Sequence, residues 1–345
     1  ELYFFANVAT GMQLWKTNGT ADGTVMVAEP NPGGDADMDD MVLYNGKLYF
    51  SATDGTNGVE LWAYDGTAAA MVKDQNIDAG AASSPKYFIE VEDLLFFEAD
   101  TGSGADLWVT DGTAEGTVLV SSLFVSTELP GDIDGSEFAV SGPYLFFSGD
   151  DAFGDDIFMV DARDIADKIK QATDINTTGD SGIGTPYAYK GEVFFEADDG
   201  VVDDELFKIA ADGSVVLVKD INTDAEDTSP NSDPKYFIEY NGLLYFNAND
   251  GDVGADKHDN ELWVTDGTTD GTQLVADIYP GAGNASNPQQ LFVFNNNLYF
   301  QAKYETSTQI WRYNGTDAPV KITSIREDGY ATPFFPCVNE ANGKV

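Results

Sequence analysis

Short segments rich in aromatic residues recur along the chain at a nearly constant spacing. Each consists of an aliphatic residue, two aromatic residues, a variable residue and a small residue. The seven segments span residues 2–6, 48–52, 95–99, 145–149, 193–197, 244–248 and 298–302. Their starts lie 46, 47, 50, 48, 51 and 54 residues apart. A period near 50 residues built from short strands predicts stacked β-units, none of which can bury its apolar face alone.

The sixth repeat shows the predicted unit most clearly. Residues 235–240 alternate as a strand, and Asn241-Gly242 follows as a two-residue hairpin turn. Residues 243–248 form the second strand, residues 261–265 the third and residues 273–278 the fourth. We therefore expect four antiparallel strands in each unit.

The third strand and the turn after it carry the most regular side chains. An aliphatic residue precedes an aromatic residue at 14–15, 61–62, 107–108, 157–158, 206–207, 262–263 and 310–311. Asp or Asn, then Gly, then Thr or Ser follows at 18–20, 65–67, 111–113, 212–214, 266–268 and 314–316. Asp or Asn closes such a turn on the backbone, and glycine supplies its left-handed position. The recurrent tryptophans predict packing between sheets, with ligand stacking as the alternative.

Seven such units predict an all-β fold, a seven-bladed β-propeller of four-stranded antiparallel blades. The longest connection joins the fourth strand of one unit to the first of the next, so we expect the first strand to be innermost. Glu1 enters at a second strand, and residues 336–345 match the strand and turn at 41–48. We expect the N- and C-terminal strands to complete one blade and close the ring. The alternative is a segment cut from a longer array. We expect residues 1–345 to form a single β-propeller domain of seven repeats within a longer chain.

The motif Glu261-Leu262-Trp263-Val264-Thr265-Asp266-Gly267-Thr268, together with residues 106–120, resembles the bacterial ELWxxDGT repeat family. The pattern is also similar to TolB-like propeller repeats, and the resemblance covers essentially the whole chain. It implies a large propeller that is secreted or exposed at the cell surface. The resemblance supplies no catalytic residues, and Phe158 and Phe207 depart from it by replacing tryptophan.

The charge balance narrows the choice of partners. Asp and Glu total 60 against 17 Lys and Arg, which gives a net charge of −43. Such a surface repels phosphate backbones and anionic lipids, so we expect no nucleic-acid binding. No run of 18 apolar residues is present, so we expect no membrane insertion. The charge favours metal cations and basic partners, or else serves solubility.

Acidic loops are the sharpest candidates for chemistry. Calcium prefers several carboxylate, amide and carbonyl oxygens, and these loops have that composition. The candidate ligands are Asp35, Asp37, Asp39, Asp150, Asp151, Asp155, Asp156, Asp198, Asp199, Asp203, Asp204, Asp250, Asp252, Asp256 and Asp259. None of the loops has the full twelve-residue calcium pattern, so structural calcium and plain solvated loops both stay open. No other cofactor is expected.

Groups for nucleophilic catalysis are scarce. The chain has one histidine, His258, and one cysteine, Cys337, so no Ser-His-Asp or Cys-His arrangement is expected. A carboxylate pair of the glycosidase kind stays open among the 60 acids. Sequons for N-glycosylation occur at Asn18, Asn176, Asn284 and Asn314.

These observations together predict a non-enzymatic extracellular or cell-surface propeller. We expect it to act as a structural, adhesion or protein-interaction module of a surface or filament assembly, stiffened by calcium. Its expected partners are proteins or glycans at the cell surface, or further copies of itself. The alternative is a carbohydrate-binding or carbohydrate-active propeller, such as a lectin, a glycoside hydrolase or a lyase.

Overall fold

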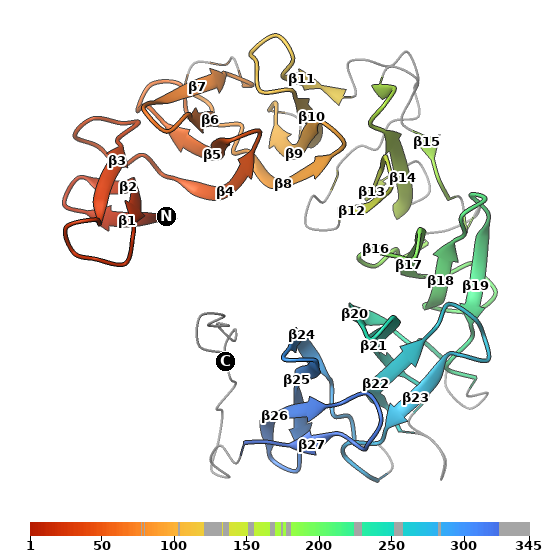
Figure 1. Cartoon of the computed structure of the whole chain (residues 1–345). Helices are drawn as coiled ribbons and strands as arrows, with labels where there is room; N and C mark the ends of the chain where they lie inside the picture. The colour runs from red at the N-terminus through yellow and green to blue at the C-terminus, as the bar shows by residue number, and fades with distance from the viewer. Residues whose placement is uncertain are drawn as a thin grey trace. The chain divides into compact units, whose positions relative to one another are not determined.

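Each alternating segment of the sequence forms a strand, and consecutive strands pair antiparallel in chain order (Figure 1). The computed structural model describes residues 1–76, 78, 80–102, 104–120, 133, 138–150, 155–165, 170–173, 175–176, 181–223, 230–251, 258–281 and 284–323. Within these residues the strands make seven sheets, of which six have four strands and the first has three. The all-β prediction is confirmed. Residues 336–345, which were expected to complete the first sheet, lie outside the described residues.

The chain divides into two compact units, and the first contains sheets one to four. This unit comprises Glu1–Ala152 and Ile157–Gln171. The first sheet consists of β1 (Leu2–Val8), β2 (Gly11–Thr17) and β3 (Val25–Ala28). The second consists of β4 (Asp39–Tyr44), β5 (Lys47–Thr53), β6 (Val59–Tyr64) and β7 (Ala69–Lys73). The third consists of β8 (Lys86–Val91), β9 (Leu94–Asp100), β10 (Ala105–Thr110) and β11 (Val118–Leu119). The fourth consists of β12 (Ala139–Ser141), β13 (Tyr144–Asp150), β14 (Asp155–Asp161) and β15 (Lys170–Gln171).

The second unit, Phe153–Asp156 and Ala172–Val345, contains sheets five to seven. The fifth sheet consists of β16 (Tyr187–Tyr189), β17 (Glu192–Ala197), β18 (Glu205–Ile209) and β19 (Val215–Lys219). The sixth consists of β20 (Lys235–Tyr240), β21 (Leu243–Asn249), β22 (Asn260–Thr265) and β23 (Gln273–Ala276). The seventh consists of β24 (Gln289–Phe294), β25 (Asn297–Tyr304), β26 (Ser307–Tyr313) and β27 (Val320–Lys321).

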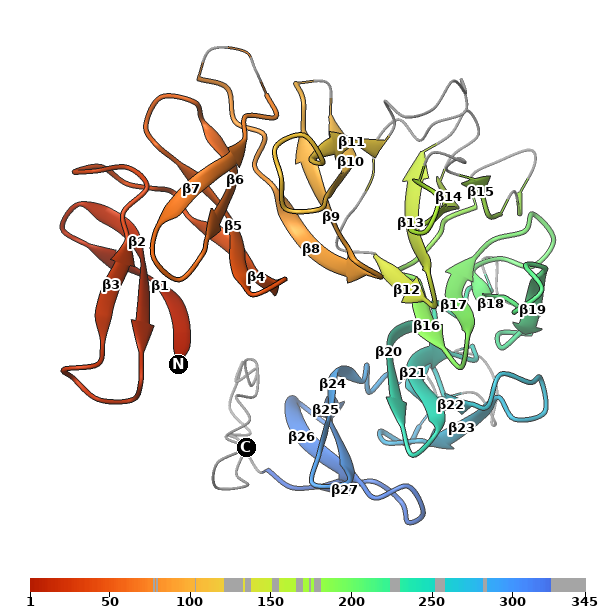
Figure 2. The same cartoon turned by 45° about the horizontal axis from the view of Figure 1, so that its top comes forward.

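Neighbouring sheets within a unit lie side by side (Figure 2), and their apolar faces are buried against each other. Phe194 of the fifth sheet shares a core with Phe246 and Trp263 of the sixth. Leu262 of the sixth sheet in turn packs with Trp311 of the seventh. Trp263 is only 6% exposed, which confirms the predicted packing role of this residue. Each core therefore needs two sheets, as the period of the sequence implies.

Strand pairs bulge at repeated places. The pairing of β20 with β21 shifts register between Lys235 and Ile238, and Tyr236 within this shift adopts φ 61°. Tyr87 of β8 has φ 56° at the same point of its own sheet. A left-handed backbone is uncommon for a bulky aromatic residue.

None of the described residues builds a helix of the length and apolar character needed to cross a membrane.

Candidate functional site

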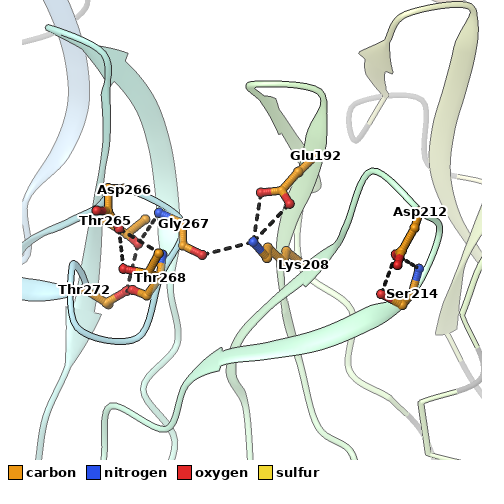
Figure 3. Close-up of polar contacts among 9 residues, drawn as sticks. All are labelled: Glu192, Lys208, Asp212, Ser214, Thr265, Asp266, Gly267, Thr268 and Thr272. Atoms are coloured by element: carbon orange, nitrogen blue, oxygen red, sulfur yellow. Dashed lines mark hydrogen bonds and ion pairs between the residues drawn. The ribbon is translucent and has the colours of Figure 1, made fainter.

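The Asp-Gly-Thr turn uses its polar side chains to close itself (Figure 3). Asp266 Oδ1 accepts hydrogen bonds from the backbone N–H and the hydroxyl of Thr268, at 2.9 and 2.6 Å. The hydroxyls of Thr265 and Thr272 lie 2.8 Å apart beneath the turn, and Gly267 has φ 96°. The bonds from Thr268 lower the pKa of Asp266. This carboxylate is therefore occupied with structure, and the motif by itself carries no chemistry.

A lysine joins the fifth sheet to this turn of the sixth. Lys208 Nζ lies 2.9 Å from Glu192 Oε2 and donates to the carbonyl oxygen of Gly267 at 3.0 Å (Figure 3). Lys219 Nζ likewise donates to the carbonyl oxygen of Thr272 at 2.8 Å. In the first unit, Lys73 reaches the carbonyl oxygen of Thr117 at 2.6 Å. These three lysines thus bind adjacent sheets together.

A buried glutamate at the start of the third strand holds the segment that leads to the next sheet. Glu261 is fully buried, and its carboxylate accepts the N–H of Ile278 at 2.9 Å. It also accepts the N–H and the hydroxyl of Ser286 at 3.2 and 2.6 Å. Glu60 binds Gln75 and Ser83 in the same way, and Glu205 binds Ile221 and Asn222. We call Glu60, Glu205 and Glu261 the clamp glutamates.

Sequence reasoning treated the clamp position only as part of a motif. The sequence does mark this position, because a polar residue precedes the aliphatic–aromatic pair of the third strand in every repeat. Burial raises the pKa of Glu205 and of Glu261 to about 7 against an ordinary value of 4.5, and also raises that of Glu60. Hydrogen bonds from backbone N–H groups act in the opposite direction. Glu205 and Glu261 are therefore structural carboxylates that titrate near neutral pH, and the pKa of Glu60 is shifted in the same direction.

One acidic cluster lies in the second unit, between the fifth and sixth sheets. Oxygens of Glu196, Asp204 and Asp233 all lie within 4.8 Å of one another. Lys235 Nζ is 3.4 Å from Glu196 and 3.5 Å from Asp233, and Asn231 Nδ2 donates to Asp204 at 2.6 Å. Burial raises the pKa of Glu196 to about 8. Of these three acids, sequence reasoning proposed only Asp204 as a metal ligand.

The other predicted ligands of the fifth repeat shape their own loop. Asp198 Oδ1 accepts the N–H of Gly200 at 2.6 Å, and Asp199 Oδ1 accepts those of Val201 and Val202, both at 2.9 Å. Asp203 lines a cavity of about 220 Å³. The structure therefore does not gather these acids around one point with Asp204.

The connecting loop of the first repeat behaves in the same way. Asp35 Oδ1 accepts the N–H of Met12 at 2.8 Å and that of Asp37 at 3.1 Å, and these bonds lower its pKa. Asp37 adopts φ 44°, and Asp39 Oδ1 accepts the N–H of Asp40 at 2.9 Å. These contacts make turns, and the metal assignment stays a prediction.

The fourth and sixth repeats hold the remaining candidates. Asp156 is buried and accepts the hydroxyls of Thr173 and Ser181 at 3.2 and 3.4 Å. Asp250 Oδ1 accepts the backbone N–H of His258 at 2.7 Å, and Asp250 Oδ2 lies 2.9 Å from Nδ1 of the His258 ring. Asp259 Oδ1 caps the N–H of Asn260 at 2.9 Å. Asp150 and Asp155 lie on strands, with side chains outside the description, and the structure does not describe Asp151, Asp252 and Asp256.

The predicted sequons differ in accessibility. Asn18 and Asn314 are exposed, and each closes an Asx turn on the threonine two residues later. Asn176 and Asn284 are half-buried, and Asn284 Nδ2 donates to the carbonyl oxygen of Pro280 at 3.1 Å. Glycosylation at all four positions stays a prediction.

A polar cleft of about 390 Å³ lies between the sixth and seventh sheets. Among the residues lining it are Tyr236, Asn247, Asn287, Gln289, Lys303 and Thr308. Sequence reasoning did not single out any of them. We call this feature the amide cleft.

Comparison with known proteins supports the fold and little else. No model of a known protein family matches the chain, and no curated protein sequence matches it. A solved structure from a study of two prolyl endopeptidases is similar over 90% of this chain and 46% of its own, with 14% identity and a TM-score of 0.51. Puromycin hydrolase is similar over 92% and 51%, with 13% identity and a TM-score of 0.47. AztD from Citrobacter koseri is similar over 92% and 78%, with 14% identity and a TM-score of 0.46. The chain spans about half the length of the first two proteins.

One expectation from the sequence is corrected here. The sequence predicted a non-enzymatic structural or adhesion module, with a carbohydrate-binding or carbohydrate-active propeller as the alternative. A solved structure of similar fold, with a TM-score of 0.51, comes from a study of prolyl endopeptidases rather than from a structural or adhesion protein. Scaffold regularity and the lack of an evident catalytic group therefore do not carry a structural or adhesion role for this chain. At 13–14% identity, the shared feature is the fold, which is β-propeller-like.

Proposed function

We propose that this chain is the propeller part of a larger peptidase-like hydrolase, in which it binds a peptide substrate without cleaving it. The observation that carries the proposal is the match of 90% of this chain to 46% of a prolyl endopeptidase chain. A part that covers about half of such an enzyme leaves room for a separate catalytic part. The amide cleft between the sixth and seventh sheets supplies a place where a peptide can bind.

The side chains support binding more than cleavage. His258 is the only histidine of the chain, and it lies against Asp250 rather than beside a serine in the residues that the structure describes. Cys337, the only cysteine, is outside them. A peptidase of the serine or cysteine type needs a nucleophile within hydrogen-bond reach of its base.

The experiment uses the full chain and a panel of short peptides that includes members blocked at both ends. Fluorescence anisotropy measures binding, and mass spectrometry measures hydrolysis in the same samples. We expect binding without hydrolysis. Failure of every peptide to bind would overturn the proposal. Hydrolysis that disappears in His258→Ala would also overturn it, by assigning catalysis to this chain.

We further propose that the seven sheets are the blades of one closed propeller, with residues 336–345 as the strand that the first sheet lacks. Support comes from the three-stranded first sheet and from the match of residues 336–345 to 41–48. We expect deletion of residues 336–345 to lower the unfolding temperature. An unchanged unfolding temperature would argue against closure.

A further inference from the structure

The amide cleft occupies the same place in its pair of sheets as the acidic cluster does in the preceding pair. Ser232 N–H and Asp233 N–H both donate to the carbonyl oxygen of Asp204, at 2.9 and 3.3 Å. In the next repeat, Ser286 N–H and Asn287 N–H both donate to that of Asn260, at 3.0 Å each. Asp233 and Asn287 have nearly the same left-handed backbone, with φ 44° and 47°. The two places are therefore built alike.

Their side chains differ systematically. Glu196, Asp204 and Asp233 of the acidic cluster correspond in the repeat to Asn247, Asn260 and Asn287. Every one of the three carboxylates is replaced by a carboxamide. Among the described residues, those that line the amide cleft include neither Asp nor Glu, in a chain with a net charge of −43. These lining residues therefore carry no negative charge that would repel an anionic group.

One lining residue has an unused hydrogen-bonding atom. Asn247 is only 4% exposed, and its Nδ2 donates to the carbonyl oxygen of Pro288 at 3.0 Å. Its Oδ1 has no hydrogen-bond partner among the described residues. Buried carboxamide oxygens normally accept a hydrogen bond, because a buried polar atom without one destabilises the fold. An N–H of a bound molecule would provide it.

The cleft also contains a cation and an exposed aromatic residue. Lys303 is exposed and forms no ion pair with the described part of the chain. Tyr236, at φ 61°, is 53% exposed. This backbone conformation belongs to the repeated bulge, since Tyr87 and Gln290 adopt it at the same point of their own sheets, and what Tyr236 adds to the cleft is an exposed ring. An ammonium, an amide acceptor and a ring thus border one cavity of about 390 Å³, within the size range of small-ligand sites.

We propose that the amide cleft binds the carboxyl-terminal end of a peptide. Lys303 pairs with the terminal carboxylate, Asn247 Oδ1 accepts the N–H of the last peptide bond, and the ring of Tyr236 covers the adjacent side chain. The carboxamides of Asn287 and Gln289 both donate and accept, as the main-chain amides of a peptide require. A single lysine matches a carboxylate better than a phosphate, which usually gathers several cationic or backbone donors. This inference rests on the proposed function.

Isothermal titration of the full chain tests the site, with acetyl-Ala-Ala-Pro-Phe as the probe and its carboxamide as the matched ligand. We expect the free acid to bind at least about tenfold more tightly than the carboxamide, and added salt to weaken its binding. Lys303→Met should remove that preference. Lys321→Met, which changes another exposed lysine of the seventh sheet, should retain it. Asn247→Asp should weaken binding of the acid by about tenfold or more, because it restores negative charge.

The outcomes separate this site from the broader proposal. Equal affinity for acid and carboxamide, or an unchanged preference in Lys303→Met, would overturn the site while peptide binding itself stands. If neither probe binds but peptides blocked at both ends do, the site is overturned and the proposed function survives. If no peptide of either set binds, both fall. Because Lys303 is exposed, circular dichroism should show Lys303→Met folded, so that a loss of binding is informative.

Discussion

The clamp glutamates make a quantitative prediction about pH and stability. We consider Glu261→Gln, which keeps the size of the side chain but removes its titration. Burial raises the pKa of Glu261 from an ordinary 4.5 to about 7 in the folded chain. At about 1.4 kcal/mol for each pKa unit, this difference corresponds to about 3 kcal/mol.

The direction follows from proton binding. Between pH 4.5 and about 7 the folded chain holds a proton on Glu261 that the unfolded chain has released. The stabilisation is therefore complete below pH 4.5 and is lost as the pH rises through about 7. The glutamine variant does not lose this stabilisation as the pH rises, because its side chain does not titrate. We expect its stability relative to the unmodified chain to improve by about 3 kcal/mol between pH 4.5 and 8, whatever its absolute value at either end.

Urea denaturation followed by tryptophan fluorescence measures the difference at each pH, with a common slope assumed for the two proteins. The other clamps titrate in both proteins and cancel in the difference. Glu115→Gln, at an exposed turn position, is the matched control for the removal of one carboxylate. A difference for Glu261→Gln that stays constant to within about 0.5 kcal/mol would refute the reasoning, because a raised pKa must appear as pH-dependent stability.

Three further predictions concern packing, the link between sheets and calcium. Trp263→Ala should destabilise the chain by about 3–5 kcal/mol, since Trp263 is buried between the fifth and sixth sheets, and a urea midpoint that does not move would contradict this. Lys208→Met should cost about 1–3 kcal/mol by leaving Glu192 and the carbonyl oxygen of Gly267 without their donor, whereas Lys47→Met at an exposed position should cost little. Calcium should raise the unfolding temperature and a chelator should lower it, if a divalent ion relieves the repulsion among Glu196, Asp204 and Asp233, and Asp233→Asn should reduce the effect. Identical melts with calcium and with chelator would remove this prediction.

The strands and turns were predictable because each rests on local chemistry. Alternation, the Asn241-Gly242 turn and the aromatic anchors predicted the sixth sheet with boundaries close to those of β20, β21, β22 and β23. The three strands of the first sheet also followed from where Glu1 enters the repeat. Each of these signals lies within about ten residues, the range over which backbone preferences act.

The candidate sites were less predictable because their residues meet only through the fold. Glu196 and Asp233 are 37 positions apart in sequence, and nothing local marks either as a partner of Asp204. Dense Asp loops predicted metal ligation, which stays a prediction, and the sequence did not indicate that Asp35 and Asp199 accept hydrogen bonds from backbone N–H groups two residues later. A carboxylate close to free backbone donors closes a turn before it can serve a distant ion.

The acidic cluster and the amide cleft suggest how one scaffold can carry different chemistry. Glu205 and Glu261 hold Ser232 and Ser286 in equivalent places, so the residue after each serine is fixed in position whatever its charge. The clamp glutamates are not among the positions that differ between the acidic cluster and the amide cleft. A carboxylate at those positions can therefore be replaced by a carboxamide with little effect on the segment that joins one sheet to the next. In the acidic cluster Lys235 pairs with Glu196 and Asp233, whereas in the amide cleft Lys303 has no ion-pair partner among the described residues. The acidic cluster and the amide cleft therefore differ in what they leave for a ligand to satisfy, and this favours the amide cleft as the proposed place where an anionic peptide end binds an otherwise repulsive protein.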